Sequence, residues 1–184
     1  MQYVRVLSGI FVCALLLTFS GQAENKFVGV KKCMTCHKIE KMGGLAYTVW
    51  EKSSHAKAYQ TLLGDEAKKI AKDKGLKTAP AESDACLKCH VTGGGAAKNV
   101  DTGFKKEEGV TCEACHGAAS AYITVHNKKT PEDKAKAKAA GLMAMDKTNG
   151  KPCESCHNAE SPSFKGFKIG EMWAKIEHGG PPKK

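Results

Sequence analysis

Cysteine and histidine recur together in one fixed spacing along this chain of 184 residues. Four copies of Cys-x-x-Cys-His are present. Two thiols three positions apart can bond the two vinyl groups on one porphyrin edge, and the histidine that follows can bind the iron. We therefore interpret the motifs as attachment sites for four haem c groups. The predicted attachment residues are Cys33, Cys36, Cys86, Cys89, Cys112, Cys115, Cys153 and Cys156, and the predicted proximal iron ligands are His37, His90, His116 and His157.

Paired cysteines also occur in disulfides and in zinc ribbons, and both alternatives were weighed. Neither requires a histidine directly after each pair. The ninth cysteine, Cys13, lies in an apolar N-terminal stretch, so the four motifs use all the other cysteines of the chain. This pattern favours haem attachment over disulfides or zinc.

Three histidines lie outside the motifs: His55, His126 and His178. Four irons offer eight axial positions, whereas the chain has 7 histidines, so at least one haem lacks a second histidine. We expect the three to be distal ligands, since imidazole is a common ligand of haem iron. The remaining haem has a methionine, a water or nothing on its distal side. The available methionines, each read more simply as apolar packing, are Met34, Met42, Met143, Met145 and Met172.

The N-terminal segment has one cation, Arg5, then an apolar stretch over 6–19 and small residues up to Ala23. This order is typical of a secretory signal peptide. We predict a signal peptide over 1–23 and one tetrahaem domain over 24–184, located in the periplasm without stable membrane insertion after cleavage. An uncleaved N-terminal anchor is the alternative.

Basic residues outnumber acidic ones in the predicted mature chain. It has 28 lysines against 19 Asp and Glu, a formal charge of +9, and no arginine. Such a surface favours an acidic redox protein or a quinol-linked membrane cytochrome as partner. The missing arginine argues against nucleic acid, because arginine supplies most bidentate contacts to bases and phosphates.

The apolar spacing predicts a mostly α fold, with short helices and loops wrapped around four covalently bound haems. Aromatic residues are only 7% of the chain, so we expect the porphyrins to supply much of the core and the apoprotein to be largely unfolded. Helices are predicted over 45–63, with His55 on it, and over 65–74, 130–140 and 167–178.

Five sequence features resemble the tetrahaem cytochrome c-554 family of nitrifying bacteria. They are Lys31-Lys32 before the first motif with Lys38 after it, Ser54-His55-Ala56-Lys57-Ala58, Val91 after the second motif, Gly109-Val110 with Glu113 and Gly117 around the third, and Glu171-Met172 before His178.

The resemblance implies two pairs of near-parallel haems. It implies the ligand pairs His37 with His126, His116 with His55, and His157 with His178, and it leaves His90 on a five-coordinate haem. The segment after His157 is shorter than in the family, so Ser161, Ser163 and Phe164 are only candidates for lining that haem's distal side.

The leading functional hypothesis is a periplasmic electron carrier, which requires no catalytic residue beyond the haems. A second hypothesis is an enzyme that reduces nitric oxide or a related nitrogen oxide at the open haem on His90. A third is a subunit of a haem filament or of a membrane redox complex.

Overall fold

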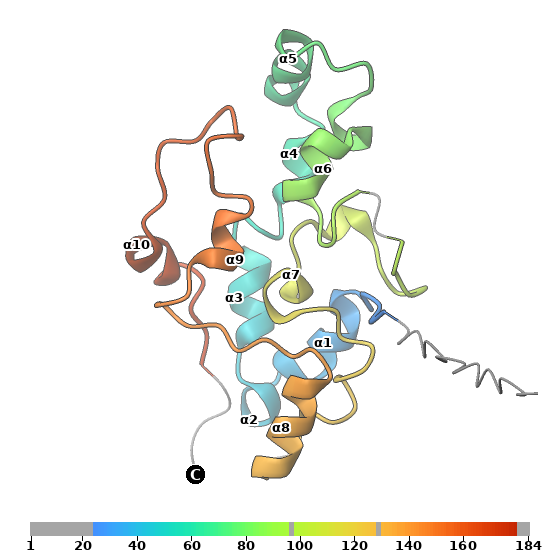
Figure 1. Ribbon diagram of the computed structural model, residues 1–184, viewed down its shortest axis with the longest axis vertical. Helices are drawn as coiled ribbons and strands as arrows, with labels where there is room; N and C mark the ends of the chain where they lie inside the picture. The colour runs from blue at the N-terminus through green and yellow to red at the C-terminus, as the bar shows by residue number, and fades with distance from the viewer. Residues whose placement is uncertain (1–23, 96–97, 128–129, 180–184) are drawn as a thin grey trace, which may run out of the picture.

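The computed structural model describes residues 24–95, 98–127 and 130–179 (Figure 1). These residues form short helices joined by turns, with one isolated bridge between Phe27 and Val100 and no strand among them. The mostly α fold predicted from the sequence is therefore confirmed. The predicted signal peptide at 1–23 lies outside the described residues. Within the described ranges, no helix is both long and apolar enough to cross a membrane.

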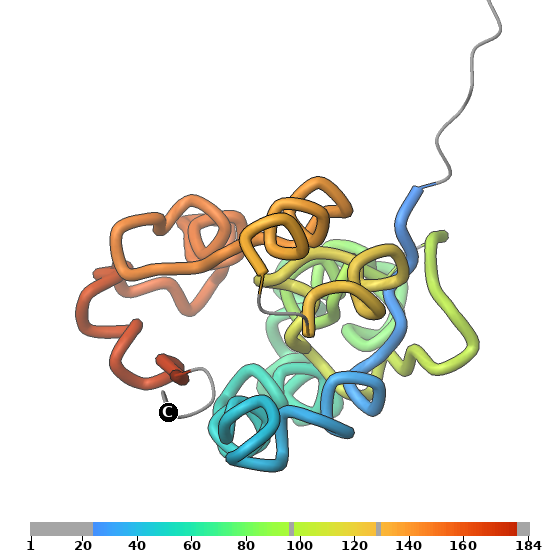
Figure 2. Tube along the Cα trace, turned by 90° about the horizontal axis from the view of Figure 1, so that it is seen from below, coloured from blue at the N-terminus to red at the C-terminus, as the bar shows by residue number. Residues whose placement is uncertain are grey.

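The chain is drawn out along one axis, with α5 at one end and α2 and α8 at the other (Figure 1). Seen along that axis, the C-terminal segment forms an arc beside the rest of the chain (Figure 2). The helices are α1 (Val30–His37), α2 (Glu40–Gly43), α3 (Ala46–Lys52), α4 (Ala58–Thr61), α5 (Asp65–Asp73), α6 (Asp84–His90), α7 (Cys112–His116), α8 (Pro131–Ala139), α9 (Lys151–Glu154) and α10 (Ile169–Trp173). Two 3₁₀ turns, Pro80–Glu82 and Lys106–Glu108, complete them.

Three of the four Cys-x-x-Cys-His motifs lie on a short helix, and the fourth begins on one. Helices α1, α6 and α7 all end at the motif histidine, and α9 begins just before the fourth motif and contains Cys153. Residues i and i+3 of a helix lie on one face, with i+4 beside them. The local fold therefore presents both thiols and the histidine of a motif on the same side.

Two small apolar clusters hold these helices together. Tyr59 and Leu62 of α4 and its C-terminal flank pack against Leu87 and Val91 at α6. Val28, just before α1, packs against Ala119, Tyr122 and Ala137, the last from α8. Since α6 and α1 carry motifs, each cluster sets the position of one motif relative to distant parts of the chain.

Two predicted helices match the structure. The segment predicted over 65–74 is α5, and that predicted over 130–140 is α8. Helix α8 is capped as its sequence suggests, because the backbone N–H of Asp133 donates to the Thr130 hydroxyl at 3.1 Å.

The helix predicted over 45–63 is wrong, because the chain breaks between α3 and α4. The Ser53 hydroxyl donates to the Trp50 carbonyl at 2.7 Å, so a side chain occupies a backbone acceptor in the last turn of α3. The His55 carbonyl in turn accepts from the backbone N–H of Val110 at 3.0 Å. His55 therefore lies on a turn, fixed by a distant segment of the chain.

The terminal helix predicted over 167–178 is also wrong in extent. Helix α10 ends at Trp173, and His178 lies beyond it in irregular backbone.

Candidate haem-binding site

Six of the seven histidines face one another in pairs. The ring centroids lie 6.1 Å apart for His37 and His126, 6.0 Å for His55 and His157, and 5.9 Å for His116 and His178. Two imidazoles on opposite sides of one iron, each with a metal–nitrogen bond of about 2 Å, hold their centroids about 6 Å apart. Each pair therefore fits two axial ligands of one haem iron, and each contains one motif histidine and one of the three others.

Two of the three pairs implied by the family resemblance are wrong in this structure. His116 faces His178 instead of His55, and His157 faces His55 instead of His178. Because α10 ends at Trp173, the last residues leave the direction of that helix and bring His178 to the third motif. The pair His37 and His126 is as implied, with the two rings inclined by only 18°.

The hydrogen bonds of the rings leave one nitrogen free for a metal. A backbone carbonyl lies 3.0 Å from Nδ1 of His37, 3.0 Å from that of His116 and 3.0 Å from that of His126. His178 Nδ1 has the same kind of partner, the Ile176 carbonyl at 2.9 Å. A carbonyl only accepts, so Nδ1 carries the proton and Nε2 is left to bind iron.

Burial favours the neutral form that binds metals in three of the paired histidines. It lowers the pKa of His37, His55 and His116, and the facing imidazole lowers each further. A backbone carbonyl at Nδ1 of His37 and of His116 partly offsets this lowering of the pKa.

His90 differs from the other motif histidines. Among the described residues no imidazole faces it. Its Nδ1 lies 2.8 Å from the carbonyl of Ala58 and 3.1 Å from the hydroxyl of Thr61, both on α4. Two of the methionines weighed as alternative ligands lie elsewhere: Met42 is 57% exposed, and Met143 meets His116 through its backbone carbonyl.

The motif cysteines meet in an order that differs from their order in the sequence. The first and third motifs lie side by side, because α1 contacts α7, and a hydrogen bond to Cys112 raises the pKa of the Cys33 thiol. The second and fourth motifs are neighbours as well, because the Cys156 thiol lies 3.9 Å from the Lys88 carbonyl oxygen, and burial and this nearby cysteine raise the pKa of Cys89. None of the eight motif cysteines is in a disulfide, as haem attachment requires.

A buried carboxylate joins the third motif to the N-terminal segment. Glu113 is 2% exposed, and its two oxygens accept from the backbone N–H groups of Val28, Gly29 and Ala119 at 2.8–3.1 Å. This role of Glu113 is not predicted by the sequence. Glu154 has the same place in the fourth motif but is exposed, so the motif alone does not identify the buried one.

Two buried threonines join the second motif to the third. The Thr92 hydroxyl lies 2.9 Å from that of Thr111, and it accepts from the Thr111 backbone N–H at 2.7 Å. Between them Gly109 has φ 73°, and a Cβ there would lie 2.7 Å from the His55 carbonyl oxygen. The third motif and the turn that carries His55 therefore need glycine at this position.

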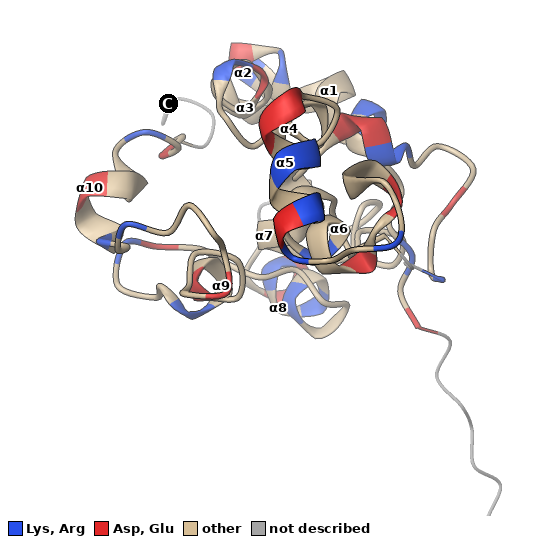
Figure 3. Ribbon diagram, turned by 90° about the horizontal axis from the view of Figure 1, so that it is seen from above, with Lys and Arg blue, Asp and Glu red and all other residues tan. Residues whose placement is uncertain are grey.

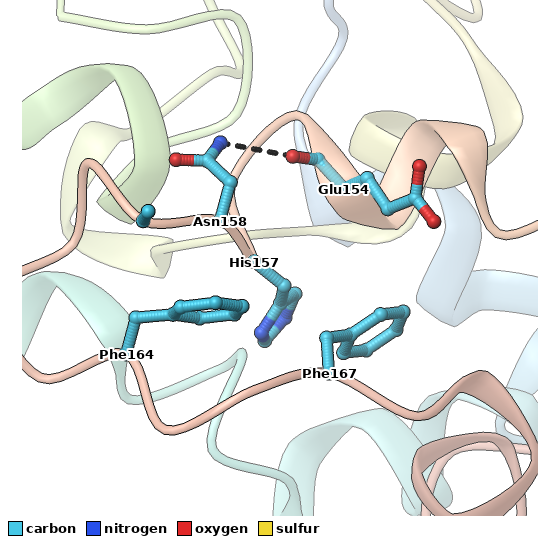
Figure 4. A pocket seen from close by; sticks show the side chains of 6 residues that line it. Glu154, His157, Asn158, Phe164 and Phe167 are labelled. Carbon is cyan, nitrogen blue, oxygen red and sulfur yellow. Dashed lines mark hydrogen bonds between the residues drawn. The ribbon is translucent and has the colours of Figure 1, made fainter.

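Aromatic rings flank His157 in an open pocket of about 320 Å³ (Figure 4). Phe167 stacks on the His157 ring with centroids 4.9 Å apart, and Phe164 lies on the other side of that ring in the view. Of the three candidates for the distal side of the haem on His90, Phe164 is thus placed beside His157. Ser161 and Ser163 contact each other at 3.3 Å, and the described contacts join neither to His90.

Motifs on short helices, with facing imidazoles between them, define a c-type cytochrome. Comparison with known proteins leads to the same class of protein. Residues 32–117 match the family model for cytochrome c554 and c-prime. The chain is 32% identical over 133 residues to cytochrome c-554 of Nitrosomonas europaea, which covers 68% of this chain and 54% of that protein. It thus spans about half the length of that relative. No solved structure matches.

The chain belongs to the cytochrome c554 family, whose members carry covalently bound haem c.

Proposed function

We propose that this chain is a periplasmic electron carrier with four haem c groups. The observation that carries the proposal is the set of three imidazole pairs with centroids 5.9–6.1 Å apart. Three of the haems then have two histidine ligands, and the haem on His90 has one. When bound, haem iron gains and loses one electron, and two nitrogen ligands that stay in place in both states favour that exchange.

The contacts between motifs support transfer through the whole chain. The first motif lies beside the third, where α1 contacts α7, and the second lies beside the fourth, where the Cys156 thiol is 3.9 Å from the Lys88 carbonyl oxygen. The third motif is joined to the fourth through His55, whose carbonyl accepts from the backbone N–H of Val110 at 3.0 Å and whose ring centroid lies 6.0 Å from that of His157. The motifs thus form one continuous series in the order first, third, fourth, second.

The partner we propose is an acidic redox protein, either free or as part of a quinol-linked membrane cytochrome. Lysines lie on α2, α5 and α8 (Figure 3). Those closest in sequence to His37 are Lys31, Lys32, Lys38 and Lys41, all exposed. Exposed charge of one sign steers an oppositely charged partner to its site.

The partner proposal is tested by charge reversal at the two ends of the molecule. Stopped-flow reduction by flavodoxin, an acidic donor protein, is measured for Lys38→Glu with Lys41→Glu. The control is Lys69→Glu with Lys72→Glu on α5, at the opposite end (Figure 1). We expect the reduction of the first variant to be slower than that of the wild type, and its rate to depend less on salt concentration. Equal rates for both double variants would contradict docking near α1 and α2.

A second candidate function is the reduction of nitric oxide or a related nitrogen oxide at the haem on His90. The specific observation that favours it is that His90 has no facing imidazole among the described residues. An open axial position allows a small ligand to bind, which the paired histidines prevent elsewhere.

The deciding experiment uses the purified holoprotein. The pyridine haemochrome assay counts haem per chain, and EPR of the oxidised protein with carbon monoxide titration of the reduced protein counts open sites. We expect four haems, with a high-spin signal and carbon monoxide uptake for one of them. If the reduced protein took up no carbon monoxide, the haem on His90 would have no open site, and electron transfer would remain as the function. Catalytic consumption of nitric oxide by the reduced protein would favour the enzyme.

A further inference from the structure

His90 has a hydrogen-bonding environment that no other described histidine shares. His37, His116, His126 and His178 each have one backbone carbonyl at Nδ1. His90 has a carbonyl and also a side-chain hydroxyl. The motif histidine without a facing imidazole is therefore also the one whose ring meets a second polar group.

Three groups form a closed set of contacts at this ring. Nδ1 of His90 lies 2.8 Å from the Ala58 carbonyl oxygen and 3.1 Å from the Thr61 hydroxyl oxygen, and that hydroxyl donates to the same carbonyl at 2.7 Å. Because the carbonyl can only accept, the hydroxyl proton points to it, and the Thr61 oxygen offers a lone pair to the Nδ1 proton. The ring thus donates to two acceptors at once.

The apolar core sets the separation of these groups. Tyr59 and Leu62, next to Ala58 and Thr61 on α4, pack against Leu87 and Val91 at the helix that carries His90. The backbone of α4 is therefore held against α6 whatever side chain stands at position 61. A substitution there changes the hydrogen bond and leaves the contact between the two helices in place.

We propose that Thr61 is a positioning residue that orients His90 and increases the basicity of its ring. The inference rests on the proposed function in one respect, that His90 binds haem iron. A second acceptor at Nδ1 gives the imidazole more anionic character, and a more basic ligand stabilises ferric over ferrous iron. With no imidazole on the other side, the whole axial field of this haem comes from this ring, so the effect is concentrated on one haem.

The test compares three variants of the holoprotein. Thr61→Val removes the hydroxyl at nearly constant shape, and Thr61→Ser keeps it. Thr35→Val is the matched control, because the Thr35 hydroxyl lies on a motif helix and bonds only the Lys31 carbonyl, at 3.2 Å. Potentiometric titration gives the four reduction potentials, and resonance Raman of the ferrous protein gives the iron–histidine stretching band of a five-coordinate haem.

We expect Thr61→Val to raise one potential and leave the other three unchanged, with a lower iron–histidine frequency. Thr61→Ser and Thr35→Val should match the wild type. The inference would be overturned if Thr61→Val left all the potentials unchanged. It would also be overturned if Thr61→Ser, which keeps the hydroxyl, showed the same rise as Thr61→Val. The open site of the proposed function is scored separately: if wild type shows no iron–histidine band and no carbon monoxide uptake, that site is closed, and the potentials still decide the role of Thr61.

Discussion

Glu113 offers the strongest test of how this chain is held together. Its carboxylate is 2% exposed and accepts hydrogen bonds from three backbone N–H groups, those of Val28, Gly29 and Ala119. Glu113→Ala leaves all three donors without an acceptor in the interior. A hydrogen bond to a charged group contributes about 1.5–3 kcal/mol, so we expect the free energy of unfolding to fall by about 5 kcal/mol or more.

The assay is thermal unfolding of the purified holoprotein, followed by far-UV circular dichroism. For a domain of this size 1 kcal/mol shifts Tm by about 2–4 °C, so the predicted loss lowers Tm by about 10–20 °C. Glu154→Ala is the matched control, since Glu154 has the same place in its motif and is exposed. We expect Glu154→Ala to change the free energy of unfolding by no more than about 0.5 kcal/mol.

The intermediate variant is Glu113→Gln, which keeps one acceptor oxygen but turns an NH₂ group toward a backbone donor. Its Tm should fall between those of wild type and Glu113→Ala, and it can be measured if the alanine variant does not accumulate. If Glu113→Ala and Glu154→Ala melted at the same temperature, the reasoning from buried hydrogen bonds would be refuted.

Three further predictions concern the haem sites. Gly109→Ala, whose Cβ would lie 2.7 Å from the His55 carbonyl, should displace His55 from His157 and raise carbon monoxide uptake by one haem per chain; unchanged uptake contradicts the steric argument. His126→Ala should open the haem on His37 and likewise add one carbon monoxide site, whereas an unaltered low-spin spectrum would mean that His126 is not a ligand. The mature chain made without haem attachment should show little helix by circular dichroism, and a helical spectrum equal to that of the holoprotein would disprove a porphyrin-dependent core.

The sequence predicted those helices whose ends are encoded locally. Helices α5 and α8 begin with acidic residues or a threonine cap and end before glycine, and both were located correctly. The break after α3 depends on the His55 carbonyl bonding Val110, 55 residues further on, which no local pattern contains. Long-range contacts, and not helix propensity, decided the elements that were missed.

The same division applies to the candidate site. The motif spacing identified four histidines from the sequence, and counting identified the remaining three as distal candidates. Neither the spacing nor the count could say which of His55 and His178 faces His116, because that depends on the path of the chain after α10. Nor could it distinguish Glu113 from Glu154, or find Thr61, since burial and tertiary contacts give these residues their roles.

The alternating contacts between motifs have a consequence for how the protein is made. Val28 bonds Glu113 across 85 residues, and Cys156 lies near the Lys88 carbonyl across 68 residues. The first motif therefore stays without its neighbour until the third has been synthesised, and the second waits for the fourth. Contacts this distant in sequence form slowly. During that delay all the motifs are accessible on an extended chain to the enzymes that attach haem, and the contacts between motifs close once the porphyrins supply the core.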